Sequence, residues 1–162
     1  FLRPLGLRLN IHRINVESAE EMYQAATAAY ADADAGILCA AVADFTPECT
    51  ADHKIKREKE DLVLRLKPTH DIAAALGKSK RENQRLVGFA LETNDEVAHA
   101  QDKLARKNLD FIVLNSLNDK GAGFRCDTNK ITIIDRQNAS TYPLKSKKEV
   151  AEDIIDKLVT LL

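Results

Sequence analysis

Residues 85–115, RLVGFALETNDEVAHAQDKLARKNLDFIVLN, decide the fold of this chain. RLVGFAL is apolar after its first residue, as in a strand that is covered on both faces of a sheet. Thr93 and Glu96 form a capping box that predicts the start of a helix, and the apolar stripe of this helix continues until about Lys107. DFIVLN (110–115) predicts a second interior strand. Strands that alternate with helices in this way indicate an α/β sheet.

The chain before this segment repeats the pattern. IHRINV (11–16) alternates like a short strand, and Ser18 with Glu21 forms a capping box that opens a helix over about 19–33. GILCAAV (36–42) is apolar at every position, which again predicts a strand covered on both faces of a parallel sheet. The start of the chain therefore predicts a strand, a helix and a strand.

The middle of the chain continues the alternation. LVLRLK (62–67) predicts an extended segment that ends at Pro68. Thr69 can cap the short helix HDIAAAL (70–76), and Gly77 occupies the usual position of the glycine that ends a helix. This helix leads into the segment that decides the fold.

The end of the chain predicts a hairpin and a final helix. KITIID (130–135) and STYPL (140–144) flank RQNA, which is the spacing of two antiparallel strands. Ser146 and Glu149 form the capping box of the last helix. We therefore expect one α/β domain over 1–162, with a Rossmann-like, mostly parallel sheet flanked by helices and an antiparallel hairpin extension.

Composition and charge exclude several classes of protein. Apolar residues make up 44% of the 162 residues and charged residues 30%, and the net charge is −1. This balance disfavours a large nucleic-acid footprint or a polybasic membrane anchor, so we expect neither nucleic acid nor membrane as a partner. No apolar run approaches the roughly 20 residues of a membrane span. The first residues lack the apolar core of a signal peptide, and we expect a cytoplasmic protein.

The three cysteines are odd in number and far apart. Cys39, Cys49 and Cys126 suit reduced thiols in a reducing compartment better than a disulfide framework. Cys39 lies in an apolar run, so we expect it to be a small buried hydrophobe. Cys49 and His53 form a single C-x₃-H pair without a second pair to complete a zinc site.

Polar residues follow the predicted strands where an α/β sheet binds its ligands, beyond the carboxyl ends. They are Asp44, the stretch 92–94 and Asn115, which can equally be turn and cap residues. Lys103 and Lys107 lie four apart on one face of the predicted helix. The residues alone favour a role for these lysines in balancing the helix dipole.

Known nucleotide fingerprints are absent from the sequence. It contains no G-x-x-x-x-G-K-[ST], and Gly121 with Gly123 forms a G-x-G that precedes no predicted helix. A P-loop kinase and a standard dinucleotide oxidoreductase are therefore disfavoured. The run 52–61 mixes acidic with basic residues, which is typical of a solvated loop.

Six ordered motifs carry a family resemblance. They are AAVADF, KIK, K-P-T-x-D-I, GFALETN, K…KNLDFIVLN and GF…D-x-N. In this order they resemble the synthetase domain of bacterial phosphopantothenoylcysteine synthetase, usually the C-terminal half of a bifunctional flavoprotein of coenzyme A biosynthesis. The similarity extends from about residue 12 to about residue 160.

The resemblance implies an enzyme that joins 4′-phosphopantothenate to cysteine. Its substrates would be CTP, 4′-phosphopantothenate and L-cysteine, with Mg²⁺ as the cation, and FMN would be present only if a decarboxylase half exists in the full-length protein. The carboxylate is first attached to the α-phosphate of CTP, and the cysteine amine then attacks the mixed anhydride. The resemblance also implies a homodimer, with the hairpin that begins at KITIID as the pairing extension.

The resemblance also implies which residues form the CTP site. Asp44 would contact the nucleotide or its cation, and Lys54, the catalytic candidate, would close over the phosphates on a flexible loop as the first residue of KIKR. THDI (69–72) replaces the usual N-P-D-I, so it departs from the family pattern at its first two residues. The implied nucleotide-binding residues are Leu38, Cys39, Ala40, Asp44, Lys54, Thr69, His70, Asp71, Ile72, Phe89, Lys103 and Lys107.

One departure leaves alternatives open. The family domain begins with a further strand and a glycine-rich turn of the SNxSSGKMG type, and residues 1–10 contain no equivalent. We therefore expect an N-terminally truncated synthetase domain. A catalytically silent nucleotide-binding or dimerisation module is the first alternative. An NAD(P) or flavin oxidoreductase is the second, which the missing G-x-G-x-x-G opposes.

Overall fold

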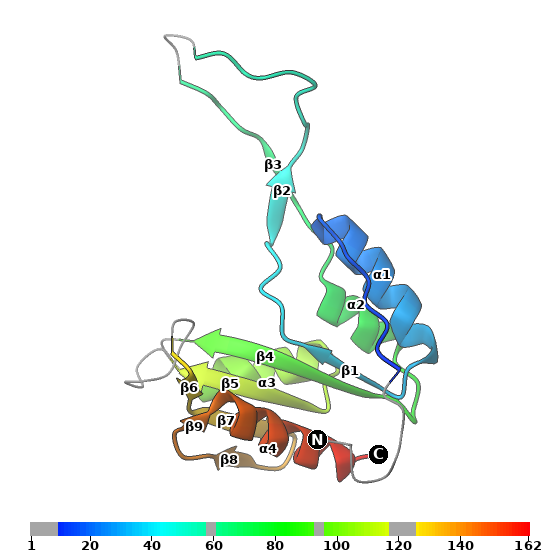
Figure 1. Ribbon diagram of the computed structural model, residues 1–162, viewed down its shortest axis with the longest axis vertical. Helices are drawn as coiled ribbons and strands as arrows, with labels where there is room; N and C mark the ends of the chain where they lie inside the picture. The colour runs from blue at the N-terminus through cyan, green and yellow to red at the C-terminus, as the bar shows by residue number, and fades with distance from the viewer. Residues whose placement is uncertain (1–9, 58–60, 93–95, 117–125) are drawn as a thin grey trace.

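A five-stranded mixed sheet forms the centre of the molecule in a computed structural model, which describes residues 10–57, 61–92, 96–116 and 126–162 (Figure 1). Its strand order is β1-β4-β5-β7-β8. β1, β4 and β5 run parallel, whereas β7 and β8 continue the sheet in antiparallel pairs. The strands are β1 (Ala35–Leu38), β4 (Arg85–Glu92), β5 (Phe111–Ser116), β7 (Ile131–Asp135) and β8 (Ala139–Thr141).

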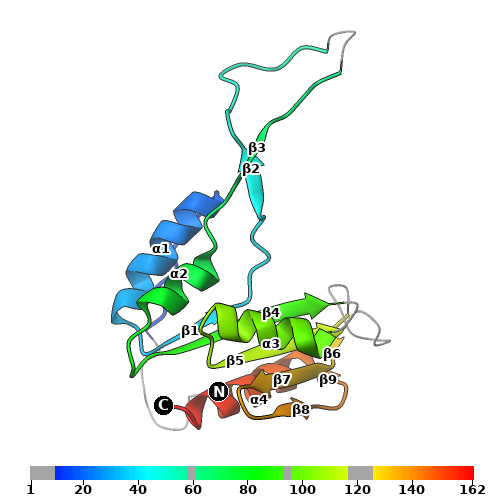
Figure 2. The same cartoon turned by 180° about the vertical axis from the view of Figure 1, so that it is seen from behind.

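Helices cover both faces of this sheet (Figures 1 and 2). Alternate residues of each central strand point to opposite faces, so Leu86 and Ile112 pack on one side while Val87 and Phe111 pack on the other. The first side is shared with helices α1, α2 and α3, and the second side with α4. The helices are α1 (Ala19–Asp32), α2 (Ile72–Ser79), α3 (Glu96–Arg106) and α4 (Lys147–Val159). The predicted α/β class is confirmed.

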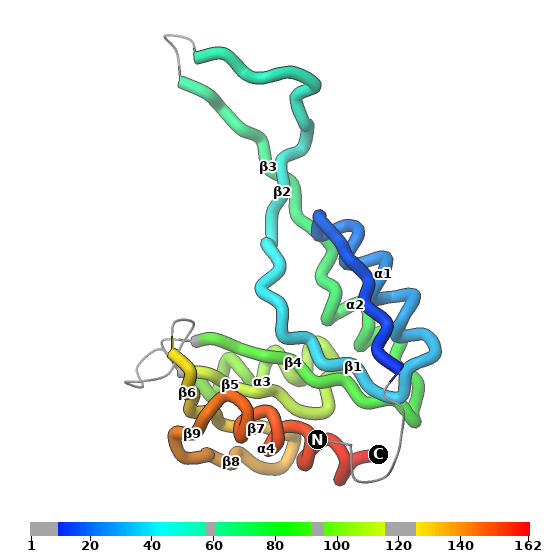
Figure 3. Tube along the Cα trace, viewed as in Figure 1, coloured from blue at the N-terminus to red at the C-terminus, as the bar shows by residue number. Residues whose placement is uncertain are grey.

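A two-stranded ribbon projects from the sheet as an arm, which we define as residues 45–57 and 61–68 (Figures 1 and 3). Its strands β2 (Phe45–Pro47) and β3 (Leu66–Pro68) are antiparallel. A second small pair, β6 (Thr128–Asn129) with β9 (Lys145–Ser146), lies beside the start of α4. None of the described helices is both long and apolar enough to cross a membrane.

The strand predicted over 36–42 is shorter than expected and is not covered on both faces. β1 ends at Leu38 and lies at an edge of the sheet, where β4 is its only partner among the described strands. Ile37 is 40% exposed, and Cys39, which lies beyond the end of β1, is exposed where a buried thiol was expected. A run of apolar residues cannot show which strand will lack a neighbour, and this prediction was wrong for that reason.

Two other predictions near the start of the chain need correction. Residues 11–16 form no strand, and Ile11 and Ile14 are exposed, because no described strand pairs with this segment. Thr69 does not cap α2, since Asp71 is the N-cap and accepts a hydrogen bond from the Ala74 amide at 3.0 Å. Thr69 instead donates its hydroxyl to the Ala43 carbonyl at 2.6 Å.

Glycine and strand predictions in the middle of the chain also differ from the structure. Gly77 lies inside α2 rather than after it. The strand predicted over 62–67 is limited to Leu66–Pro68. Thr93, part of the capping box expected before α3, lies outside the described residues, as do Gly121 and Gly123.

The remaining helix predictions are confirmed. Ser18 caps α1 by accepting from the Glu21 amide, although the Glu21 carboxylate accepts from Glu17 rather than from Ser18. Ser146 and Glu149 form a complete capping box at α4. The predicted hairpin exists as β7 and β8, and it extends the main sheet.

Candidate functional site

A cavity of about 540 Å³ opens at the β1 edge of the sheet. Its walls come from α1, from β1 and the loop that follows it, from the segment before α2, from β4 and from the end of α3. Every predicted nucleotide-binding residue except Lys54 lines this cavity. The topology explains the gathering, because parallel strands bring their carboxyl ends to one edge.

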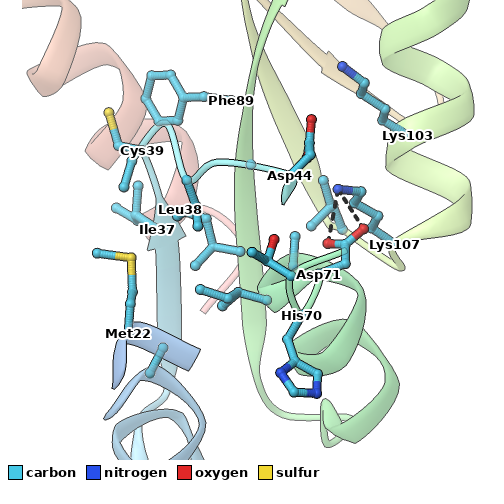
Figure 4. Close-up of a pocket in the computed structure, with 18 of the residues that line it drawn as sticks. Met22, Ile37, Leu38, Cys39, Asp44, His70, Asp71, Phe89, Lys103 and Lys107 are labelled. Carbon is cyan, nitrogen blue, oxygen red and sulfur yellow. Dashed lines mark hydrogen bonds and ion pairs between the residues drawn. The ribbon is translucent and has the colours of Figure 1, made fainter. Parts of the chain in front are cut away.

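The two sides of the cavity differ in chemistry (Figure 4). Lys103 of α3 and Lys107, which directly follows this helix, approach from one side, while Met22, Ile37 and Cys39 lie on the other. A ligand that fits both sides carries negative charge at one end and a less polar body at the other. A nucleoside phosphate has this distribution of charge.

Lys107 is paired with an acidic residue of the same cavity. Its Nζ lies 3.0 Å from Oδ2 and 3.1 Å from Oδ1 of Asp71 (Figure 4). Partial burial acts to raise the pKa of the Asp71 carboxyl, but the Ala74 amide and the Lys107 ammonium outweigh it and hold this pKa below its ordinary value. Asp71 therefore stays ionised, caps α2 and directs Lys107 at the same time.

The backbone of Lys107 is fixed by close packing between α3 and α2. A Cβ at Gly77 would lie 1.9 Å from the Lys107 carbonyl oxygen, so only glycine allows this approach. Asn108 has a left-handed φ of 49° and donates its side-chain amide to the Gly77 carbonyl at 2.9 Å. Sequence reasoning missed this role of Gly77 because the contact is made with a residue 30 positions away.

The segment 69–71 is held by its side chains and backbone together. The Thr69 amide donates to the Asp44 carbonyl at 2.9 Å, in addition to the hydroxyl contact with Ala43. His70 stacks on Tyr23 of α1, with ring centroids 4.3 Å apart and 16° between the planes. The His70 Nδ1 also lies 2.8 Å from Oε2 of Glu20.

Asp44 is the cavity residue with the chemistry of a magnesium ligand. Its side chain is exposed where the chain leaves β1 for the arm. In the ranges that the structure describes, no three His, Cys, Asp or Glu side chains gather as a metal site. Mg²⁺ is usually held by one or two carboxylates together with substrate phosphates, so Asp44 fits a cation that arrives with a nucleotide.

Lys54 is the one predicted residue that the structure does not bring to the cavity. It is exposed on the arm, and it is not among the residues that line the cavity. The arm also carries exposed apolar side chains, including Val63 at 81% and Leu62 at 64%. The role of Lys54 therefore stays a prediction.

Sequence reasoning missed the contribution of α1 to the cavity. Met22 and Ala26 line it, although their spacing on one helix face predicts only contact with the core. The aromatic and acidic residues Tyr23 and Glu20 of the same helix hold His70. No local signal separates a helix face that packs on a sheet from one that also borders a cavity.

Comparisons with known proteins match this chain over nearly its whole length. The family model described as the DNA/pantothenate metabolism flavoprotein C-terminal domain matches residues 4–162. A protein of an unknown prokaryotic organism, named cysteine/cysteine sulfinic acid decarboxylase, is 57% identical over 162 residues, which cover 99% of this chain and 45% of that protein. The coenzyme A biosynthesis bifunctional protein CoaBC of Bacillus subtilis (strain 168) is 44% identical over 149 residues, which cover 91% of this chain and 36% of that protein.

A solved structure of a related domain is similar to this chain in both fold and sequence. The crystal structure of the C-terminal domain of a coenzyme A biosynthesis bifunctional protein CoaBC superposes with a TM-score of 0.72 at 35% sequence identity. The match covers 91% of this chain and 66% of that one. The chain spans less than half the length of the two curated relatives.

Proposed function

The chain belongs to the DNA/pantothenate metabolism flavoprotein C-terminal domain family, and from this premise we propose that it is a phosphopantothenate–cysteine ligase of coenzyme A biosynthesis. One observation carries the proposal. A single cavity presents Lys103 and Lys107 opposite an apolar wall and places Asp44 at its edge. This arrangement suits a nucleoside triphosphate with its cation, and the resemblance in sequence specifies CTP.

The reaction needs activation of a carboxylate, because a carboxylate is a poor electrophile. An oxygen of the 4′-phosphopantothenate carboxylate attacks the α-phosphorus of CTP, and pyrophosphate leaves. The amine of cysteine then attacks the acyl carbon, which forms the amide and releases CMP. Negative charge develops on phosphate oxygens in the first step, so nearby ammonium groups lower its barrier.

The residues of this chain divide that work by position. Lys103 and Lys107, at the end of α3 and directly after it, bind phosphate oxygens, and the apolar wall accepts the cytidine. Asp44 would hold Mg²⁺ together with the phosphates, and the bound ion would neutralise part of their charge. Lys54 reaches the phosphates by movement of the arm, and it is the residue that we expect to act on the first step, in which the acyl-cytidylate forms and pyrophosphate leaves.

Titration calorimetry with CTP, ATP and NADPH in the presence of Mg²⁺ tests the proposal. The ligase function requires that CTP binds most tightly and that the chelator EDTA weakens its binding. A preference for NADPH would contradict the ligase function and favour an oxidoreductase. Absence of binding by all three nucleotides would favour a catalytically silent module.

The relative that is named as a decarboxylase supports a second candidate function for this chain. At 57% identity it is more similar than the Bacillus subtilis protein, so this chain can be the companion part of a cysteine or cysteine sulfinate decarboxylase. The discriminating measurement is CO₂ release from these two amino acids, compared with pyrophosphate release from CTP. Decarboxylation without any use of CTP would favour the second candidate.

The proposal also covers the cellular location, the oligomeric state and the flavin cofactor of the protein. We place it in the cytoplasm, which the three free cysteines support because thiols stay reduced there. We also propose a homodimer, with the exposed edge strand β8 of the hairpin as the pairing element. FMN is a cofactor only if the full-length protein contains a decarboxylase half. Sedimentation velocity measures the oligomeric state, and a monomer at micromolar concentration would contradict the dimer.

A further inference from the structure

Three side chains join helix α1 to the segment that precedes α2. The His70 ring is stacked on Tyr23, and its Nδ1 lies 2.8 Å from the Glu20 carboxylate. Two different interactions thus hold one imidazole, and both partners lie on the first turns of α1. The other side-chain contacts of this segment come from Thr69 and Asp71. Thr69 contacts the chain after β1, and Asp71 contacts the first turn of α2 and Lys107, which directly follows α3.

The His70 ring points away from the cavity, although His70 is part of the cavity wall (Figure 4). Its side chain is committed to α1, so the part of His70 that borders the cavity is near its backbone. The same is true of Thr69, whose hydroxyl is bonded to Ala43. The segment 69–71 therefore presents main chain to a ligand and uses its side chains as attachments.

The same contact holds the first turns of helix α1 beside the segment 69–71, while the buried Tyr30 anchors the end of this helix in the core. Met22 and Ala26 of α1 line the cavity, and Met22 lies on the apolar side, opposite the lysines. Tyr23, which follows Met22 directly, carries the His70 ring. Movement of α1 away from His70 would therefore widen the apolar side of the cavity while leaving Lys103 and Lys107 in place.

We propose that His70 is a positioning residue that sets the affinity for the base end of the nucleotide. Held by Tyr23 and Glu20, it fixes α1 against the segment 69–71 and keeps the apolar side narrow enough for a flat pyrimidine. This inference rests on the proposed function, because it takes the ligand to be a nucleotide. It assigns to the His70 side chain an effect on binding that is exerted through Met22 and the main chain, without direct contact between the imidazole and the ligand.

Substitutions of the two stacked rings test the inference. An aromatic pair of this kind contributes about 0.5 to 1.5 kcal/mol, so His70→Ala and Tyr23→Ala should each raise the dissociation constant for CTP about three- to tenfold. His70→Phe and Tyr23→Phe keep the stacking and should retain most of the affinity. His12→Ala changes an exposed histidine outside the cavity and serves as the matched control.

A second measurement does not depend on a ligand. Hydrogen exchange of the Thr69 amide, which donates to Asp44, should become faster in His70→Ala and stay slow in His70→Phe. Melting temperatures identify any variant that fails to fold, and such a variant is replaced in the comparison by the other alanine substitution.

The outcomes separate the inference from the proposed function. Failure of the unchanged protein to bind CTP overturns the proposed function, whatever the exchange rates are. Normal CTP binding by both alanine variants overturns the inference and leaves the proposed function standing. Faster exchange without a loss of affinity also overturns the inference, since the segment would then be held by His70 without influencing the ligand.

Discussion

Lys107 shows how single residues prepare the cavity for an anion. Its backbone is fixed by Gly77, and its ammonium is held by Asp71, so its position is set before any ligand binds. Lys103 projects from the same helix, one turn earlier. Their place at the end of α3 also suits the helix-dipole role that the residues alone suggested.

Removal of either cavity lysine should weaken nucleotide binding. We expect Lys103→Ala and Lys107→Ala each to raise the dissociation constant for CTP about tenfold, since hydrogen bonds to charged groups contribute about 1.5 to 3 kcal/mol and these side chains are partly exposed. The loss should shrink as salt screens the phosphates. Calorimetry at low and high salt measures it, with Lys78→Ala, an exposed residue of α2, as the control. Equal CTP affinities of the unchanged protein and the three variants would mean that Lys103 and Lys107 have only a structural role.

Gly77→Ala should destabilise the protein in spite of better helix propensity. Alanine is favoured over glycine inside a helix by about 1 kcal/mol, but its Cβ would meet the Lys107 carbonyl. Such overpacking costs about 1 to 3 kcal/mol, so the free energy of unfolding should fall. Urea unfolding measures the change.

Gly36→Ala is the matched control for that substitution. An added Cβ there would lie 3.1 Å from Cδ1 of Leu86, which is the movable end of a side chain. Its effect on stability should therefore be smaller than that of Gly77→Ala. The reverse order would show that α2 can shift away from α3.

At the scale of elements, the arm separates a predicted catalytic residue from the binding cavity. Lys54 is exposed on the arm, while the other predicted residues line the cavity. Binding of CTP and its reaction can therefore depend on different parts of the chain. The distinction is testable because glutamine removes the charge of Lys54 and keeps a polar side chain of similar length.

Lys54→Gln should slow the first chemical step without weakening the fold. We expect CTP-dependent pyrophosphate release to fall at least about tenfold, the size of effect typical for lost stabilisation of developing charge. The melting temperature and the affinity for CTP should change little, because Lys54 is exposed and lies outside the cavity wall. Unchanged pyrophosphate release would remove Lys54 from the mechanism.

The elements also show what hydrophobic patterns can and cannot predict. β4, α3 and β5 were predicted closely, because both faces of these central strands are covered and their apolar runs reflect it. β1 has a similar run, but it is an edge strand. The pattern of apolar residues in a segment shows how apolar that segment is. Whether the segment is buried depends on neighbouring elements, which come from distant parts of the chain.

The candidate site also combines residues that could be predicted from sequence with residues that could not. Of the residues that leave the predicted strands, Asp44 lines the cavity, whereas Asn115 does not and instead accepts a hydrogen bond from Asn129. The family resemblance supplied Lys103 and Lys107. The contributions of Gly77 and of the α1 residues could not be predicted, since each arises from contact between two elements. Asp71 was expected at the site, but its role as N-cap was given to Thr69, because both residue types are good caps.

At the scale of the whole molecule, ionised carboxylates join elements on both faces of the sheet. Asp71 pairs α2 with Lys107, and Asp135 pairs β7 with Lys157 of α4 at 2.8 Å. The hydrogen bond from Lys157 is the main cause that holds the pKa of Asp135 below its ordinary value of 3.8, and the pKa of Asp71 is also lowered. Because folding lowers these pKa values, the carboxylates stabilise the fold fully above the ordinary value, and this contribution is lost as the pH falls through the folded value.

The protein should therefore lose stability in acid and show little change between about pH 5.5 and 7 from these groups. Urea unfolding from about pH 3 to pH 7 measures the slope, which should be steepest below the ordinary aspartate pKa of 3.8. Asp135→Asn removes one of the titrating groups while its side-chain oxygen can still accept the amides of Gln137 and Asn138. This variant should be less stable than the parent at pH 7, by about 1 kcal/mol or less for a partly exposed pair, and the difference should vanish at low pH. A constant difference across the whole range would mean that the charge of Asp135 contributes nothing to the stability of the fold.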